Sequence, residues 1–161
     1  MGKDFTYILI DCQPNFDLLT QNAIISSDYY IIPTKFDYLS ILGIDTLNSH
    51  INKLLQELSL SIQEFNFKGY DSKPRLLGVV GNMVNIKKGN ELVAINSNSI
   101  NLIKPEYKIF DQSLRNNPEM MDMQGLIPAV LKKNYSNTQK AVVNELNMIT
   151  KEFKERIRKG I

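Results

Sequence analysis

Short apolar runs recur along the chain and end at a polar residue or a proline. Runs rich in β-branched and aromatic residues predict four strands, at residues 5–11, 29–32, 76–83 and 107–114. Pro33 ends the second run, and the third again ends in a polar stretch. Because the first run is apolar on both faces, it is typical of a strand buried inside a parallel sheet.

Helical spacing of apolar residues fills the intervals between these runs. It predicts three helices, at residues 16–27, 37–58 and 137–158, with weaker helices over 90–104 and within 118–133. Asn15 or Asp17 can cap the first of them. The polar stretch 59–73 reads as a loop or a frayed helix end. Strands separated by helices predict an α/β fold, a mostly parallel sheet flanked by helices, in a single domain over residues 1–161.

Candidate chemistry begins at Asp11, which closes the first run. Parallel strands deliver such a residue to the carboxyl edge of the sheet, where ligands bind. An aspartate there can hold Mg²⁺ against a nucleotide phosphate.

Cys12 is the single cysteine, as expected in a reducing cytoplasm, and we interpret it as a small buried side chain that fills space in the core. His50 reads as a helix-surface residue, and a zinc site would need more cysteine and histidine.

The net charge of +2 hides an asymmetry between the body and the end of the chain. Residues 1–131 carry 11 basic and 14 acidic side chains, whereas residues 132–161 carry 8 basic and 3 acidic ones. A basic end on a slightly acidic body favours a polyanionic partner, either nucleic acid or an anionic membrane. The alternative is a solvated helix face. No apolar run reaches membrane-spanning length.

The segment from Asp4 to Pro14 resembles the Walker B segment of ParA-type partition ATPases, in which an apolar run is followed by Asp, any residue and two prolines. Four further segments are similar to this family in the same order: residues 18–24, 27–34, 37–43 and 77–83. The stretch from Pro128 to Phe153 resembles the family's closing helix. The resemblance implies the rear part of a P-loop nucleotide-binding fold.

The resemblance also implies a function, ATP-dependent segregation of plasmid or chromosomal DNA. It implies ATP and Mg as cofactors, and as partners non-specific DNA, a ParB-type centromere-binding protein and a second copy in a homodimer, with no membrane. The expected location is cytoplasmic and nucleoid-associated. At the positions that match the family motifs, Asp11 would be a ligand of Mg²⁺ and would lie close to Asn82. Asn82, Pro33 and Thr34 would border the nucleotide.

The DNA contacts that the resemblance implies lie in the rear half of the chain. The candidates are Arg115, Lys132, Lys133 and Lys140, with auxiliary charge from Lys154, Arg156, Arg158 and Lys159. Such contacts would go to phosphates and ignore base sequence. The alternative is that Arg115 caps a strand end and the other charges solvate a helix.

Two departures from the family pattern change the expectation. Gln13 replaces the first proline, and neither Gly-Lys-Ser nor Gly-Lys-Thr occurs in the printed sequence. We therefore expect this chain alone neither to bind ATP usefully nor to hydrolyse it, although the parent family is an ATPase. The alternative function is a non-catalytic DNA-binding or protein-interaction module derived from such an ATPase.

The missing phosphate-binding loop also affects the sheet. In the family the strand that precedes this loop lies between the two strands that match residues 5–11 and 29–33. Both runs would then expose apolar edges, unless they close up on each other or a partner supplies the strand. The third possibility is a poorly stable chain.

Overall fold

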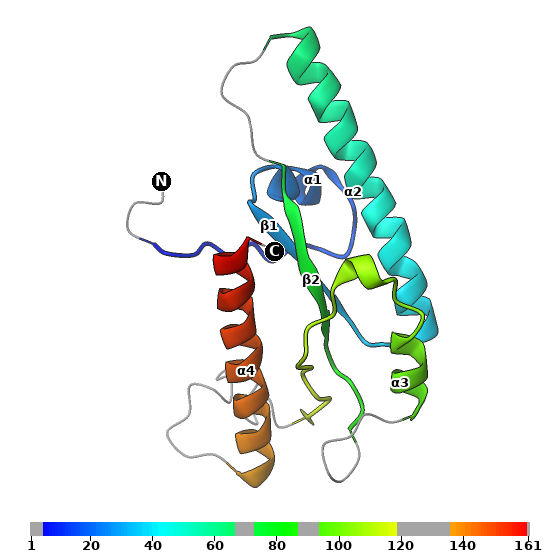
Figure 1. Ribbon diagram of the computed structural model, residues 1–161, viewed down its shortest axis with the longest axis vertical. Coiled ribbons are helices and arrows are strands. Elements are labelled where there is room, and N and C mark those ends of the chain that lie inside the picture. The colour runs from blue at the N-terminus through cyan, green and yellow to red at the C-terminus, as the bar shows by residue number, and fades with distance from the viewer. Residues whose placement is uncertain (1–4, 67–72, 87–93, 119–135, 161) are drawn as a thin grey trace. The chain divides into compact units, whose positions relative to one another are not determined.

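The computed structural model describes residues 5–66, 73–86, 94–118 and 136–160 (Figure 1). Its elements, in chain order, are α1 (Leu18–Ile25), β1 (Tyr29–Thr34), α2 (Tyr38–Glu64), β2 (Arg75–Gly81), α3 (Ala94–Ile100), the 3₁₀ helix η1 (Pro105–Tyr107) and α4 (Asn137–Lys159). The predicted α/β class is confirmed. The helix predicted within residues 118–133 lies largely outside the described residues.

The chain divides into two compact units, which we describe separately. The first comprises the described residues up to Tyr30 and from Asp45 to Arg75. The second comprises Ile31–Ile44 and the described residues from Leu76 onward. Most of the fully buried apolar side chains belong to the second unit: Phe36, Ile44, Leu77, Val79, Val84 and Val142.

β1 and β2 form a two-stranded sheet, in which the strands lie side by side (Figure 1). Arg75 N–H donates to Asp28 O at 3.1 Å, and Asn82 N–H donates to Thr34 O at 2.7 Å. This order of partners is that of parallel strands, as predicted. β1 continues through Pro33 to Thr34, so the prediction that Pro33 ends it was wrong by two residues. A proline is tolerated in a strand where its nitrogen faces away from the ladder.

The predicted fourth strand is reduced to two isolated parallel bridges, one to β2 and one to Val84, three residues after β2 ends. Val79 pairs with Ile109, and Val84 pairs with Arg115. Between these bridges the Asp111 N–H donates to the carboxylate of Glu152 on α4, at 3.0 and 3.2 Å. Phe110 N–H donates to Val79 O, but Leu114 N–H, and not that of residue 112, donates to Gly81 O. The segment therefore departs from a continuous ladder between these residues, and the prediction of a regular strand over 107–114 was wrong.

The predicted first strand is also absent. Residues 5–13 belong to no strand or bridge of the described structure, and residues 5–15 are exposed. The apolar side chains are among them: Phe5 is 73% exposed and Leu9 is 80% exposed. A strand requires a hydrogen-bonding partner as well as an apolar sequence, and the described sheet gives this run none.

The helix boundaries follow from local capping. Asp17 accepts from Thr20 N–H at 3.0 Å and begins α1, as its sequence position predicted. Before α2, Asp37 accepts from Ser40 N–H at 2.8 Å and from the Ser40 hydroxyl at 2.9 Å. These two bonds, the backbone one foremost, hold the pKa of Asp37 below its usual value. α2 extends to Glu64, beyond its predicted end at 58, so the stretch after residue 58 begins as helix and not as loop.

α4 is the most regular element. Its capping box pairs the Ser136 hydroxyl with Gln139 N–H and the Gln139 side chain with Ser136 N–H, each at 3.1 Å. The helix ends at Gly160, whose φ of 66° suits glycine. The predicted span of 137–158 is confirmed to within one residue. Across the described residues, no helix combines the length and apolarity needed to cross a membrane.

Candidate functional site

The carboxyl ends of β1 and β2 meet in the second unit and bring three predicted residues together. Thr34 is the last residue of β1 and is buried, and Pro33 beside it is exposed. Asn82 directly follows β2, and its N–H donates to Thr34 O at 2.7 Å. Its side chain is half-buried. Pro33, Thr34 and Asn82 therefore share one sheet edge, the usual ligand edge of a parallel sheet.

Both strands leave this edge through a strained residue. Phe36, two residues after β1, has φ = 56°, and Met83, two residues after β2, has φ = 54°. Residues other than glycine rarely adopt this left-handed backbone conformation, and those that do recur at functional sites. Phe36 is completely buried, whereas Met83 is 51% exposed. The packing of Phe36 therefore stabilises the first turn, and Met83 places an apolar side chain at the open surface beside Asn82.

Asn96 on α3 is a residue that the sequence analysis missed. Its side-chain amide donates to Lys35 O and to Phe36 O, both at 3.2 Å, and so fixes the turn after β1. Within the described part of the chain, Asn96 Oδ1 and Thr34 Oγ1 are buried and have no hydrogen-bond partner. Buried polar atoms are nearly always paired, so this edge carries two polar atoms that cost stability.

The unpaired hydroxyl leads to a first prediction. Replacing Thr34 with valine, which has the same shape, should raise the free energy of unfolding by about 1 kcal/mol, because it removes a buried donor without opening a cavity. Urea unfolding of the two proteins measures the change. Thr150→Val is the control, because the Thr150 hydroxyl donates to Leu146 O at 2.7 Å and its loss should bring no gain. A loss of 1 kcal/mol or more in Thr34→Val would show that the hydroxyl has a partner.

Asp11, the predicted Mg²⁺ ligand, lies in the first unit and is exposed. It follows the run that forms no strand, so its predicted place at a strand end was wrong. Asn82 belongs to the second unit, and the expected proximity of the two residues stays a prediction. Among the described residues there is no group of three or more acidic, histidine or cysteine side chains that could hold a metal ion.

The two other singled-out residues have clear positions. Cys12 is exposed, so its reading as a buried filler was wrong. Its neighbours are exposed as well, because the run that would have buried it is not part of the sheet. His50 is an exposed residue of α2, as predicted, and its ring centroid lies 5.5 Å from that of Phe16.

Arg115, a predicted DNA contact, is engaged with α4. Its Nε donates to Glu145 Oε1 at 2.7 Å, and its Nη2 lies 2.6 Å from the same oxygen. Its backbone N–H donates to Glu145 Oε2 at 3.0 Å. The Arg115 side chain is 23% exposed and that of Glu145 is 9% exposed. Both guanidinium contacts thus go to one carboxylate oxygen, and the other oxygen accepts from the backbone N–H. This largely buried ion pair attaches α4 to Arg115, the residue bridged to Val84.

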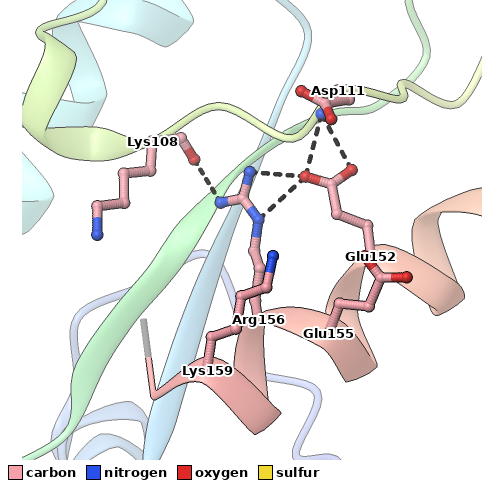
Figure 2. A pocket seen from close by; sticks show the side chains of 6 residues that line it. All are labelled: Lys108, Asp111, Glu152, Glu155, Arg156 and Lys159. Atoms are coloured by element: carbon pink, nitrogen blue, oxygen red, sulfur yellow. Dashed lines mark hydrogen bonds and ion pairs between the residues drawn. The ribbon is translucent and has the colours of Figure 1, made fainter.

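Arg156, which the sequence analysis named as auxiliary charge for DNA, makes a second attachment of α4 (Figure 2). Its guanidinium donates to Leu77 O, Lys108 O and Ile109 O at 2.7–2.8 Å and pairs with Glu152 at 2.6 Å. It also lies 4.1 Å from the centre of the Phe110 ring. Gly78 makes room for it: a Cβ there would collide with Arg156 and with Lys108 O. The charge of Arg156 is used inside the protein.

A shallow depression of about 310 Å³ surrounds this attachment. Figure 2 shows its six lining residues, which are Lys108, Asp111, Glu152, Glu155, Arg156 and Lys159. The depression has three cationic and three carboxylate side chains, and the central pair, Arg156 and Glu152, is already an ion pair. The depression therefore offers no net charge to an ionic ligand, and we interpret it as a structural contact.

The outer face of α4 is different. Six exposed side chains follow each other at steps of three or four residues and so form one stripe, which we call the α4 stripe: Lys140, Asn144, Asn147, Lys151, Lys154 and Arg158. It contains four cations and no carboxylate. Lys151 was missed by sequence, although the 3.6-residue period of the predicted helix would have found it. Lys132 and Lys133 lie outside the described residues.

Comparison with known proteins supplies a family. Residues 1–64 match the model of a family described as an AAA domain. The ParA chromosome partitioning protein of Myxococcus xanthus is 30% identical over 78 residues, which are 47% of this chain and 28% of that protein. The Bacillus subtilis sporulation initiation inhibitor protein Soj is 32% identical over 60 residues, 37% of this chain and 24% of Soj. An uncharacterised Pseudomonas putida protein is 37% identical over 75 residues, 45% of this chain and 28% of its own.

The matched stretch thus spans about a quarter of each of these relatives. Over the part that they cover, these matches show a relationship to the ParA-type P-loop ATPases.

Proposed function

We propose that this chain is a ParA-like protein of plasmid or chromosome partition that binds DNA without sequence preference through the α4 stripe. The observation that carries the proposal is the separation of charge on α4. Two of its three carboxylates, Glu145 and Glu152, turn inward and pair with Arg115 and Arg156. The third, Glu155, is exposed at the margin of the stripe, four residues after Lys151. The four cations of the stripe are exposed.

The stripe has the dimensions of a phosphate-contacting surface. From Lys140 to Arg158 it runs about 27 Å at 1.5 Å per residue. Phosphates follow each other every 3.4 Å of helix axis along one DNA strand, so several lie within that length. The two asparagine amides between the cations can also donate to phosphate oxygens. None of these groups selects a base sequence, which supports non-specific binding.

The nucleotide part of the proposal rests on the sheet edge. Pro33, Thr34 and Asn82 would border a nucleotide, and Asp11 would serve its Mg²⁺, when a phosphate-binding loop is present. By itself the chain would hold neither ATP nor Mg²⁺, because the printed sequence has no Gly-Lys-Ser or Gly-Lys-Thr. A ParB-type protein and a second copy of the chain would be its partners in the cytoplasm, on the nucleoid.

The absence of that motif from the sequence favours a second candidate, a non-catalytic DNA-binding or interaction module of ParA-type origin. Both candidates use the α4 stripe. They differ in nucleotide response: DNA affinity that rises with ATP would favour the partition ATPase, and affinity independent of ATP would favour the module.

The DNA proposal predicts a steep salt dependence. Four cations on phosphates should give a slope of log affinity against log salt of about −3.6. In the double variant Lys151→Gln, Lys154→Gln the slope should shrink by about 2, and binding at 50 mM salt should weaken about tenfold. Fluorescence polarisation with two duplexes of unrelated sequence measures both quantities.

The matched control is Lys35→Gln, Lys53→Gln, which removes the same charge from exposed positions outside α4. It should change affinity less than twofold. Equal losses in the two double variants would show that net charge, and not the stripe, binds DNA. A preference of tenfold or more between the duplexes would contradict non-specific binding.

A further inference from the structure

The four cations of the α4 stripe are unevenly spaced along the helix. Lys140 stands near its start, whereas Lys151, Lys154 and Arg158 follow one another in its second half. At 1.5 Å per residue, Lys140 lies about 16.5 Å from Lys151 along the axis, and Lys151 lies about 10.5 Å from Arg158. The stripe therefore consists of two groups of positive charge with a gap between them.

The gap, residues 141–150, exposes no charge. Its exposed side chains are those of Asn144, Asn147, Met148 and Thr150. The one charged residue in this interval, Glu145, is paired with Arg115 on the inner face. Asn144 and Asn147 lie on the line of the stripe, and each amide has both donors and an acceptor. Asn144 Nδ2 donates to the thioether of Met148 at 3.6 Å, a weak acceptor that a base edge or a water can replace.

This spacing suits two rows of phosphates better than one. Along one DNA strand a phosphate recurs about every 3.4 Å of helix axis, so a helix laid along that strand would pass several phosphates without a cation. The major groove of B-DNA is about 12 Å wide and the minor groove about 6 Å, and the phosphate groups of the two walls add roughly 6 Å. The gap of about 16.5 Å is therefore close to the distance between the walls of the major groove and exceeds that of the minor groove.

Glu155 indicates how the helix is oriented on the groove. It is exposed, and it lies about 60° around the helix axis from Arg158. A helix lying lengthwise inside the groove would turn both of its flanks to phosphates and would bring this carboxylate against one wall. A helix lying across the groove turns only its stripe to the DNA, which keeps the carboxylate at the margin. The position of Glu155 thus favours a crossing orientation.

We propose that α4 lies across the major groove of duplex DNA, with Lys140 at the phosphates of one wall and the group of three cations at those of the other. Asn144 and Asn147 then face the base edges. Guanine, adenine and thymine each present an acceptor in this groove, so every base pair offers one to an amide, directly or through water. The contact therefore stays non-specific. The inference rests on the proposed DNA binding and adds the groove to it.

Glucosylated DNA tests the groove. When glucosyl-5-hydroxymethylcytosine replaces every cytosine of a duplex, neutral sugars fill the major groove and the phosphate charge is unchanged. The full chain should bind this duplex about tenfold more weakly than the plain duplex of the same sequence, because the sugars occupy the groove that α4 bridges. Netropsin, which fills the minor groove of A·T tracts, should lower the affinity for the plain duplex less than about threefold. Fluorescence polarisation measures these affinities.

The double variant Asn144→Ala, Asn147→Ala tests the amides. It should weaken binding to the plain duplex about fivefold but to the glucosylated duplex less than about twofold, because the sugars already keep the helix out of the groove. Alanine favours helix, so the helix content by circular dichroism should not fall. The matched control is Asn22→Ala, Asn52→Ala, which removes two exposed amides outside α4 and should leave both affinities within twofold of the wild type.

The possible results separate this inference from the proposed function. Equal affinity for the plain and glucosylated duplexes would overturn the crossing of the major groove and leave DNA binding by the stripe intact. Tenfold competition by netropsin would overturn it in favour of the minor groove. Equal losses of the Asn144→Ala, Asn147→Ala variant on the two duplexes would show that the amides contact phosphates and not base edges. A chain that does not bind the plain duplex at all would contradict the proposed function and this inference together.

Discussion

Arg156→Met should lower the free energy of unfolding by about 3–5 kcal/mol, the range for breaking a buried, hydrogen-bonded ion pair. The substitution keeps the apolar stem and removes the guanidinium. Leu77 O, Lys108 O and Ile109 O each lose the donor described above, and Glu152 loses its cation. Glu152 is only 15% exposed, so its charge would be left poorly solvated. Urea unfolding followed by circular dichroism measures the loss.

Arg158→Met is the control for this experiment. It removes the same side chain from the exposed face of the same helix and should change stability by less than about 0.5 kcal/mol. Gly78→Ala tests the contact between β2 and Arg156 from the side of the strand. Gly78 has φ = 149°, and a Cβ there would collide with Arg156, so this variant should lose about as much unfolding free energy as Arg156→Met. An Arg156→Met protein as stable as the wild type would show that the guanidinium does not attach α4 to β2.

The elements that sequence predicted well carry their own local signals. α4 has a capping box at Ser136, an apolar stripe that includes Val142, and a glycine at its end. β1 and β2 are short β-prone runs, and this strand character is also a local signal, whereas their parallel pairing was inferred from the helix between them. The caps and the strand-prone runs depend on residues a few positions away, so the sequence was sufficient to place these elements.

The predictions that failed concern pairing between distant segments. The apolar pattern of residues 5–11 is that of a strand, but pairing depends on a neighbour that the described sheet does not provide. The fourth strand is interrupted between Phe110 and Leu114, whose N–H groups donate to Val79 O and Gly81 O, about 30 residues earlier in the chain. Asn96 was missed for the same reason: its role is to bind the backbone of Lys35 and Phe36, about 60 residues earlier. No local pattern in an asparagine-rich stretch signals such a contact.

For the basic residues, charge alone did not separate exposed from internal cations. Arg156 and Arg158 are two residues apart on one helix, and only the first is paired inside the protein. Two residues on a helix are about 200° apart, so the two arginines point to different sides. The structure therefore moves Arg156 from the candidate DNA contacts to the packing of α4 and adds Lys151 to the exposed stripe.

Arg115 needs a separate test, because it is a candidate DNA contact that the structure pairs with Glu145. Arg115→Ala should lower the free energy of unfolding by about 3 kcal/mol, since it leaves a carboxylate that is 9% exposed without its cation. Among the described residues, the Glu145 carboxylate would then keep the backbone N–H of residue 115 as its donor, at 3.0 Å. Chemical denaturation of the variant measures this loss.

The double variant Arg115→Met, Glu145→Leu separates the pair from its surroundings. Removing both charges leaves no buried ion unpaired, so the double variant should regain at least half of the stability that Arg115→Ala loses. If the double variant is as unstable as Arg115→Ala, packing around Arg115 and not the unpaired carboxylate is responsible.

DNA binding is then compared under conditions in which the denaturation curve of each protein shows that at least 95% of it is folded. Folded Arg115→Ala should bind DNA within twofold of the wild type and keep the same salt slope, because the arginine charge is already neutralised by Glu145 at 2.6 Å. Lys151→Gln should instead reduce the slope by about 1. A folded Arg115→Ala protein with a tenfold loss of affinity and a slope reduced by about 1 would show that Arg115 releases Glu145 and contacts a phosphate.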